Sequence, residues 1–562
     1  MNKRAAPLAL IFMALGLFSG CPASPGGTMV DLVLINGSVW TGNPRQARAE
    51  AVAVRGDKIY KVGTTGEIRT LARDRAAVVD VKGALVLPGF IDSHTHFLAG
   101  GFALKSLQLR DATSRGEFAA RIAAKSRGIG KGEWIINGDW DHEQFSPPEL
   151  PRKEWIDAVT PDNPVCINRF DGHMVLANSA ALKLAGITRD TPVPAGGEIV
   201  KDPKTGEPTG ILKDAAMELV YAKIPEPSFQ EKLRAAEASL KEAAAHGVTS
   251  VHEMADASSF EVPEELDRQH KLTARLYVYI PITEVDFLSR LKIKSPFGGR
   301  FLKLAGLKGF VDGSLGSGTA YFFDPYSDDP KTSGLLHEQM FPEGIMEKRI
   351  READRAGLQV AIHAIGDRAN NLLLDIFERV MAENGPRDRR WRVEHAQHLR
   401  PADIARFGRL GVVASVQPYH LIDDGRWAEK KIGRERVETA YAFRSLLDAG
   451  AVLAFGSDWT VAPLDPVAGI YAAVTRRTLD GKNPGGWIPG QKITVEEAVI
   501  AYTAGAAFTE FAETSKGTIE EGKLADLVVL SRDIFRIPAE EILGAGVRMT
   551  IVDGKIVYRK EE

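Results

Sequence analysis

Cysteine is nearly absent from this chain of 562 residues, which contains only Cys21 and Cys166. A framework of internal disulfides is therefore excluded if Cys21 is modified. The chain also lacks a long basic run, and its formal net charge is −3. A protein that holds nucleic acid usually needs a basic surface to neutralise phosphates, so no nucleic-acid partner is expected. We expect a small molecule as the partner, and a homo-oligomer is left open.

The N-terminus lacks an apolar run long enough to span a bilayer comfortably. Lys3 and Arg4 precede the apolar run from Ala5 to Phe18, a pattern typical of an export signal. The sequence "LFSGC" at its end resembles the bacterial lipobox, in which Cys21 becomes the lipidated first residue. We expect a lipoprotein-type signal peptide over 1–21 and a tether over 22–29. The protein would then be exported and held on the periplasmic or outer side of a membrane only by the lipid on Cys21. The alternative is an ordinary signal peptide, in which Cys21 has no such role.

The two ends of the remaining chain share one pattern. Residues 30–85 contain short apolar or alternating strands broken by glycine turns, such as "DLVLINGSVWTG". Residues 513–562 repeat it in "GKLADLVVLSRD" and "VRMTIVDGKIVY". The sequence therefore predicts a small β-sandwich built from both termini.

The middle of the chain, residues 86–512, alternates apolar strands with helical segments, the pattern of parallel βα units. Eight strands are predicted, the number that closes a (β/α)8 barrel; they are "VLPGFIDSH", "GVTSVHEM", "ARLYVYIPI", "LAGLKGFVDG", "LQVAIHAIGD", "RVEHAQH", "GVVASVQP" and "AVLAFGSDW". The predicted fold is α/β, a TIM barrel with the small β-sandwich beside it. Residues 101–247 exceed one βα connection, so we expect an insertion there that covers the barrel mouth.

Two histidines stand where the first predicted barrel strand ends. His94 and His96 are two positions apart and so point to the same side of a strand, which suits a metal ion. Taken alone this pair is a weak signal, because it is more typical of core or surface histidines that bind no metal. Four further ligand-type residues end other predicted strands, and these ends all face one mouth of a barrel: Lys308, His363, His395 and Asp458. An unpaired ammonium group is costly to bury, so a lysine among apolar residues needs an explanation. Carboxylation would make Lys308 an anionic ligand that bridges two cations.

Several stretches carry a resemblance that spans residues 30 to 560. They include "LPGFIDSHTH", "INRFDGHMVLANSAAL", "KGFVDGSLGSGTA", "HAIGDRANNLLLD", "VEHAQHL" and "FGSDWTVAPLDP". The chain resembles the amidohydrolase superfamily, in particular the amidohydrolase family 3 branch with proteins like N-substituted formamide deformylase. The resemblance implies a metal-binding barrel with a composite sandwich. It also implies a metal shell made of the same six residues, His94, His96, Lys308, His363, His395 and Asp458.

The ligand set suggests a mechanism. Two divalent cations, most simply zinc, would share a hydroxide that attacks a carbonyl, and Asp458 would carry the proton to the leaving nitrogen. His94, His96 and Asp458 would hold one ion, His363 and His395 the other, and carboxylated Lys308 both. With a single ion, Lys308 or some histidines would bind substrate instead. Lys213, after an inserted hairpin, is a weaker candidate for the bridge.

Other residues are candidates for substrate contact. His173 matches a histidine position of the family, and we expect it to stabilise an oxyanion or orient the substrate. Arg169 lies near it in sequence, and Trp140 offers a flat apolar surface. Asp312 is the third candidate for substrate contact, or it orients a metal ligand. Each of these residues has an alternative structural role: His173 would be a hydrogen-bonded structural histidine, Trp140 would belong to the core, and Asp312 would cap a helix.

The predicted function is hydrolysis of a carbon–nitrogen bond other than a peptide bond, in an amide, N-acyl or N-formyl compound, by a metal-activated hydroxide. Related hydrolases that cut dipeptides or phosphoesters share such a metal shell. An exported ligand-binding protein on a hydrolase scaffold is the alternative from another class. Such a protein has no need for a proton carrier at Asp458.

Overall fold

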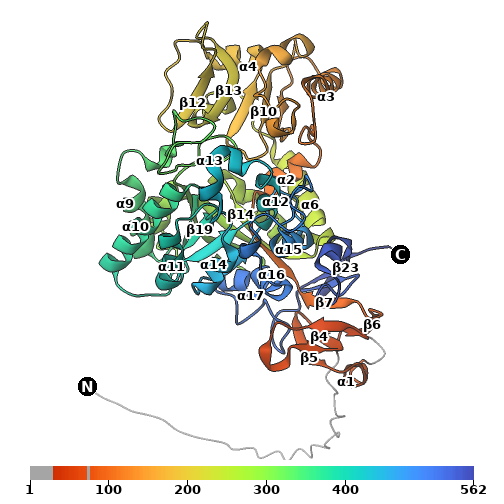
Figure 1. Cartoon of the computed structure of the whole chain (residues 1–562). Helices are drawn as coiled ribbons and strands as arrows, with labels where there is room; N and C mark the ends of the chain where they lie inside the picture. The colour runs from red at the N-terminus through yellow and green to blue at the C-terminus, as the bar shows by residue number, and fades with distance from the viewer. Residues whose placement is uncertain (1–29, 73–75, 562) are drawn as a thin grey trace, which may run out of the picture.

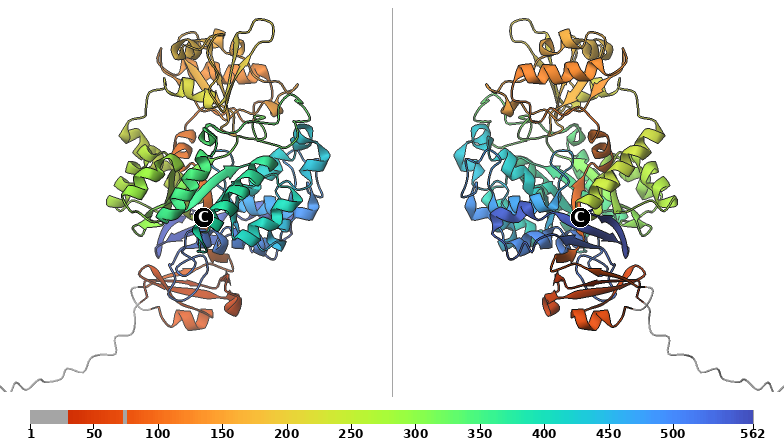
Figure 2. Two further views of the ribbon diagram at one scale, coloured as in Figure 1. Left: turned by 90° about the vertical axis from the view of Figure 1, so that its left-hand side faces the viewer. Right: turned by 90° about the vertical axis from the view of Figure 1, so that its right-hand side faces the viewer.

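The computed structural model describes residues 30–72 and 76–561, so Cys21 and the tether 22–29 lie outside the described residues. Three layers follow one another along the long axis of the molecule (Figures 1 and 2): a β-sandwich at one end, a barrel in the middle and a second small sheet at the other end. Within the described ranges, no helix combines the length and apolar character needed to cross a membrane.

The barrel contains all eight predicted strands, and the predicted fold is confirmed. The strands pair in parallel in the chain order: β8 (Phe90–Thr95), β14 (Val248–Met254), β15 (Arg275–Pro281), β17 (Leu302–Phe310), β18 (Val360–Ala364), β19 (Arg392–His395), β20 (Val413–Val416) and β21 (Leu453–Phe455). Two backbone hydrogen bonds of 2.7 Å close the ring between β21 and β8: Asp458 N–H donates to His94 O, and His96 N–H donates to Trp459 O. The first predicted strand is split at Gly89, and its first half, β7 (Leu85–Pro88), leaves the barrel.

Helices follow the barrel strands and pack around them, as amphipathic βα units require. They are α2 (Phe97–Ala103), α6 (Phe229–Ala245), α7 (Glu261–Arg268), α8 (Val285–Arg290), α9 (Ile345–Ala356), α10 (Asp367–Asn384), α11 (Pro401–Leu410), α12 (Pro418–Asp424), α13 (Ala428–Val437), α14 (Phe443–Asp448), α15 (Pro466–Thr475), α16 (Val495–Ala501) and α17 (Ala504–Thr509). Helix α6 begins with a capping box at Ser228 and Glu231, and its Leu240 joins the main barrel core.

The β-sandwich combines both ends of the chain. One sheet has the order β5-β4-β1-β6, from β1 (Leu32–Ile35), β4 (Ala51–Arg55), β5 (Lys58–Gly63) and β6 (Ala77–Asp80). The other runs β24-β23-β22-β7-β2-β3, with β2 (Ser38–Trp40), β3 (Arg48–Ala49), β22 (Leu527–Leu530), β23 (Val547–Val552) and β24 (Lys555–Arg559). The antiparallel pairing of β22 with β7 joins the C-terminal part to the N-terminal part.

The second small sheet lies within the long connection between β8 and β14, at the end of the molecule opposite the sandwich (Figure 1). Its strand order is β12-β13-β11-β10-β9, from β9 (Ile135–Ile136), β10 (Val165–Asn168), β11 (Met174–Ala177), β12 (Gly197–Lys201) and β13 (Pro208–Asp214). Helices α3 (Arg115–Arg127), α4 (Ser179–Ala185) and α5 (Glu218–Tyr221) accompany it. The predicted range 101–247 is too long for this excursion, because α6 belongs to the barrel. We refer to the part between α2 and α6 as the insertion.

A buried polar cluster lies inside the barrel, toward the end opposite the mouth. Glu510 follows α17, and its carboxylate accepts hydrogen bonds from Ser250 Oγ and His252 Nε2, both at 2.9 Å. Lys516 Nζ lies 2.5 Å from the same carboxylate. Burial alone would raise the pKa of Glu510, but Lys516 and His252 outweigh it and lower this pKa to about 2.

Replacing Glu510 by Gln is expected to destabilise the protein by on the order of 3 kcal/mol at pH 7, because Lys516 stays buried without its partner. The folded-state pKa is depressed, so this stabilisation is complete above the unfolded pKa of about 4.3 and is lost as the pH falls toward 2. Urea unfolding from pH 7 to pH 2.5 should show the wild type and Glu510→Gln converging in acid.

Glu521→Gln is the matched control, because Glu521 pairs with Lys61 at 3.0 Å on the surface, with half of each side chain exposed. An exposed pair contributes less than about 1 kcal/mol. A difference in the free energy of unfolding between the wild type and Glu510→Gln that stays constant from pH 7 to pH 2.5 would contradict the prediction.

Candidate active site

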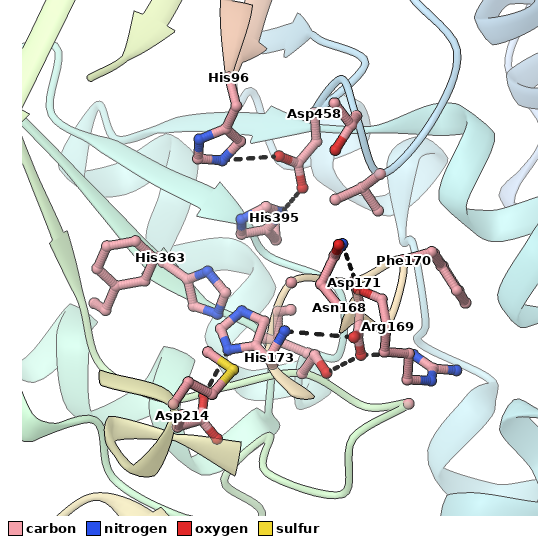
Figure 3. A pocket seen from close by; sticks show the side chains of 18 of the residues that line it. His96, Asn168, Arg169, Phe170, Asp171, His173, Asp214, His363, His395 and Asp458 are labelled. Carbon is pink, nitrogen blue, oxygen red and sulfur yellow. Dashed lines mark hydrogen bonds and ion pairs between the residues drawn. The ribbon is translucent and has the colours of Figure 1, made fainter. Parts of the chain in front are cut away.

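A cavity of about 570 Å³ opens at the carboxyl ends of the barrel strands, between the barrel and the insertion. Figure 3 shows side chains from both parts pointing into it. All six predicted metal ligands line this cavity, from strands β8, β17, β18 and β19 and from the segments after β8 and β21: His94, His96, Lys308, His363, His395 and Asp458.

The carboxylate of Asp458 lies at the centre of three histidines. Its Oδ1 is 3.6 Å from His94 Nε2 and 3.4 Å from His96 Nε2, and its Oδ2 is 3.9 Å from His395 Nδ1. Oδ1 is buried and accepts no hydrogen bond from any described residue. Ligand atoms of His94, His395 and Asp458 all lie within 4.8 Å of one another. A buried carboxylate oxygen without a donor, surrounded by imidazole nitrogens, fits a divalent cation.

Backbone strain helps to aim two of these side chains. His395 has φ = 75° and Asp458 has φ = 57°, both in the left-handed region that residues with a side chain rarely adopt. Each lies at or just after the end of a barrel strand, where the chain turns sharply. Such conformations cost energy and cluster at functional sites.

The three fully buried histidines among the predicted ligands each have one ring nitrogen on an acceptor oxygen, which fixes the tautomer. The His94 Nδ1–H donates to Glu394 at 2.5 Å, and the His395 Nδ1–H donates to Gln417 Oε1 at 2.8 Å. The His363 Nε2–H donates to the Gly313 carbonyl at 3.1 Å. Partners of this kind orient metal-binding imidazoles in many proteins.

The electrostatics of the site suit metal binding. Burial, with help from neighbouring cationic groups, lowers the pKa of His94, His363 and His395 well below the usual range, so they are neutral. Burial opposes ionisation of Asp458, but interactions with the neighbouring imidazoles outweigh it and hold the pKa of this carboxyl well below its usual range. Neutral imidazoles and an ionised carboxylate are the protonation states that a metal requires.

Lys308 lies beside this group. Its Nζ is buried, 3.3 Å from His94 Nε2, and burial lowers its pKa to about 8. A lowered pKa provides more of the neutral amine that carboxylation needs. Lys213, the weaker candidate for the bridge, lies in β13, pairs with Glu198 at 2.8 Å and does not line the cavity.

The insertion adds polar groups to the opposite wall. His173 Nδ1 lies 2.6 Å from Asp214 Oδ1, and its ring centre is 5.2 Å from that of His363. Burial opposes the charge, but Asp214 raises the pKa of His173. Arg169 lines the same wall, fully buried, and donates to Asp171 at 2.6 Å.

Two predicted substrate contacts are corrected by the structure. Trp140 is fully buried in the core of the insertion, and its indole N–H donates to Ile167 O at 2.9 Å, so it does not reach the cavity. Asp312 is also fully buried, and its carboxylate accepts hydrogen bonds from the backbone N–H groups of three loop residues, Tyr321, Ile365 and Gly366. Asp312 therefore holds loops around the barrel mouth, and its Oδ1 lies 3.6 Å from His363 Nε2.

Some residues of the site were missed by the sequence reasoning. Glu394, Gln417 and Asp214 orient histidines, and His337 lines the cavity. Glu394 had a detectable signal, because Arg392 and Glu394 alternate within a strand that is otherwise buried. Two charges on one face of such a strand must be paired inside the barrel.

A parallel barrel with buried histidines and an aspartate at its mouth defines a metal-dependent hydrolase. Residues 77–558 match the model of the Amidohydrolase family, and the chain belongs to this family. Protein LONG AFTER FAR-RED 3 of Arabidopsis thaliana is 41% identical over 547 residues, covering 95% of this chain and 92% of the relative. N-substituted formamide deformylase of Arthrobacter pascens is 29% identical, covering 95% and 99%. The crystal structure of a metal-dependent hydrolase from Pyrococcus horikoshii superposes with a TM-score of 0.73 and 30% identity, covering 91% of this chain and 99% of that one.

Replacing Glu394 by Gln is expected to weaken metal binding about 10- to 100-fold, because His94 loses the anionic partner that fixes its ring. Competition between the protein and a coloured chelator measures this affinity. Glu513→Gln is the matched control, since Glu513 also accepts hydrogen bonds from an arginine, Arg390 at 2.9 Å, and does not line the cavity. Equal metal affinity in both variants would contradict the role assigned to Glu394.

Proposed function

We propose that this protein hydrolyses a carbon–nitrogen bond other than a peptide bond, in an amide, N-acyl or N-formyl compound. The observation that carries the proposal is the ionised Asp458 carboxylate, whose Oδ1 has no donor and faces neutral histidines at the barrel mouth. The family supports hydrolysis, and the name of the Arthrobacter pascens relative supports an amide of this kind.

The residues that would hold a divalent cation are His94, His96, His395 and Asp458, with His363 and Lys308 beside them. Two or more imidazole nitrogens with one carboxylate oxygen favour zinc. When bound, such a cation polarises a carbonyl and lowers the pKa of water. Carboxylation of Lys308 would add a bridging anion between two cations, and its lowered pKa supports this part of the proposal.

The chain's own groups can move the proton. Asp458 is ionised at neutral pH, so it can accept a proton from the attacking water and deliver it to the leaving nitrogen. An amide nitrogen leaves poorly until it is protonated. His173, which Asp214 favours in the cationic form, lies on the opposite wall and can donate to the oxygen that becomes negative.

Replacing Asp458 by Asn is expected to lower kcat for N-acyl amides at least about 100-fold in the metal-loaded protein, because the proton carrier is lost. Asp424→Asn is the matched control, since Asp424 lines the same cavity, and its carboxylate accepts a hydrogen bond from Tyr441. Hydrolysis is followed as released amine. If the wild type and Asp458→Asn bind the ligand equally tightly and neither protein hydrolyses it, the result would favour a binding protein on a hydrolase scaffold.

The number of metal ions per chain tests the bridge. Elemental analysis of the protein begun after Cys21 should give about two ions per chain, falling to one or none in Lys308→Ala, if Lys308 is carboxylated and shared. Lys213→Ala is the control and should keep the wild-type content, because this lysine lies on the insertion. A content of about one ion per chain that is the same in Lys308→Ala would contradict the bridging role of Lys308 and leave the hydrolase proposal intact.

We also propose that the protein is exported and anchored through a lipid on Cys21, on the sequence evidence alone. A Cys21→Ser variant, expressed in a bacterium with lipoprotein processing, should move from the membrane fraction to the soluble fraction. Immunoblots of the two fractions measure this. Wild-type protein in the cytosolic fraction would contradict export.

A further inference from the structure

His337 lies in the loop after β17, directly before the 3-10 turn Glu338–Met340. Its backbone N–H donates to Val311 O at 2.8 Å, and its ring stacks on Phe310, with the ring centres 4.9 Å apart and the planes inclined by 21°. The Phe310 ring also contacts the ring of His363, at 5.2 Å between the centres. His337 therefore has a fixed place in the cavity, two ring contacts away from the predicted metal ligand His363.

The hydrogen bonds of His337 also fix which ring nitrogen carries the proton. Its Nδ1 accepts a hydrogen bond from the backbone N–H of Gln339 at 3.2 Å. A neutral imidazole has one acceptor nitrogen and one N–H group, so the proton lies on Nε2. Burial lowers the pKa of His337 to about 4, so the ring is neutral at pH 7. The side chain of Gln339 accepts from the Phe310 N–H at 3.2 Å, so one residue holds both rings of the stack.

The Nε2–H group of His337 has no acceptor among the described residues. His337 is half-buried and lines the cavity, so this group can meet a molecule that enters it. The charge of Asp214 acts on His337, but the carboxylate of Asp214 already lies 2.6 Å from His173 Nδ1. An N–H group that is fixed in place and has no acceptor suits a ligand that carries one.

We propose that His337 determines part of the substrate specificity: its Nε2–H donates a hydrogen bond to an acceptor atom in the substituent of the amide, such as an ether oxygen on a benzyl ring. This inference rests on the proposed function, in which the scissile amide lies against Asp458. No hydrogen bond, ion pair or ring contact joins His337 to Asp458 among the described residues, so the donor meets a part of the substrate away from the scissile bond. The path of ring contacts from His363 through Phe310 to His337 has a length that an oxygen-substituted benzyl group can match.

Substrates that differ only in the acceptor test this role. N-formyl methoxybenzylamines, with the oxygen at the ortho, meta or para position, are each compared with the ethylbenzyl compound of the same shape. A substrate without the acceptor excludes water from the Nε2–H and leaves it unpaired. The metal-loaded wild type should therefore favour the methoxy compound about tenfold in kcat/KM at one ring position or more. Equal kcat/KM values within every pair would overturn the inference while the proposed function stands.

His337→Phe removes both ring nitrogens and keeps an aromatic ring on Phe310. In this variant the ratio of kcat/KM between the methoxy and ethyl compounds should fall to about one, because the donor is lost. His337→Gln has an amide donor and should retain part of the preference. His246→Phe is the matched control and should keep the wild-type ratio, because His246 is half-buried at the C-terminal end of α6 and does not line the cavity. A preference that persists in His337→Phe, with folding verified by thermal melting, would contradict the role of His337.

Calorimetry with metal-free protein separates this inference from the proposed function. The wild type should bind at least one methoxy compound about tenfold more tightly than its ethyl counterpart, and His337→Phe should bind the two equally. Absence of turnover of all these formamides would count against the proposed function, and the calorimetric comparison would still decide the role of His337. Equal affinities within every pair in the wild type, or no measurable binding of any compound, would overturn the inference.

Discussion

The buried guanidinium of Arg392 supports the floor of the cavity. It donates to Glu394 at 2.7 Å and to the Ser93 carbonyl at 2.5 Å, and Glu394 in turn accepts from the His94 ring. On its other side it lies 2.6 Å from His252 Nδ1, and His252 Nε2 meets Glu510. These contacts form one polar column along the barrel, from the segment after α17 to His94 at the mouth.

This column explains why a barrel interior that is usually filled with branched aliphatic side chains contains charges here. An arginine or glutamate in such a place is tolerated only when each polar atom has a partner, and the removal of one partner leaves the other buried and unpaired. The column therefore couples the stability of the barrel to the orientation of His94. The C-terminal segment, through Glu510 and Lys516, becomes part of the support of the site although it lies far from the cavity.

The sequence predicted the parts of this structure that depend on local pattern. Eight apolar segments with turns between them specify the barrel, and a ligand-type residue at the end of a strand must face the mouth, so His94, His363, His395 and Asp458 meet in one cavity. The rest depends on contacts between distant residues. Glu394 lies 300 positions from His94, and nothing near Trp140 indicates that its indole packs inward on Ile167. The length of the insertion was overestimated because the sequence of α6 predicts a helix whether that helix belongs to the insertion or to the barrel.

The arrangement separates the two requirements of a hydrolase on one chain. The groups suited to hold a cation and move a proton come from the barrel strands and the segments that follow them, where the closed ring of hydrogen bonds and the polar column fix them rigidly. The insertion contributes apolar side chains to the cavity, and it joins the barrel rim through ion pairs such as Arg110 with Asp423, at 2.5 Å, and Arg426 with Asp141, at 3.3 Å. A change of residue among the apolar side chains that the insertion contributes to the cavity, such as Ile136 and Met217, can alter the ligand that fits without touching the barrel groups.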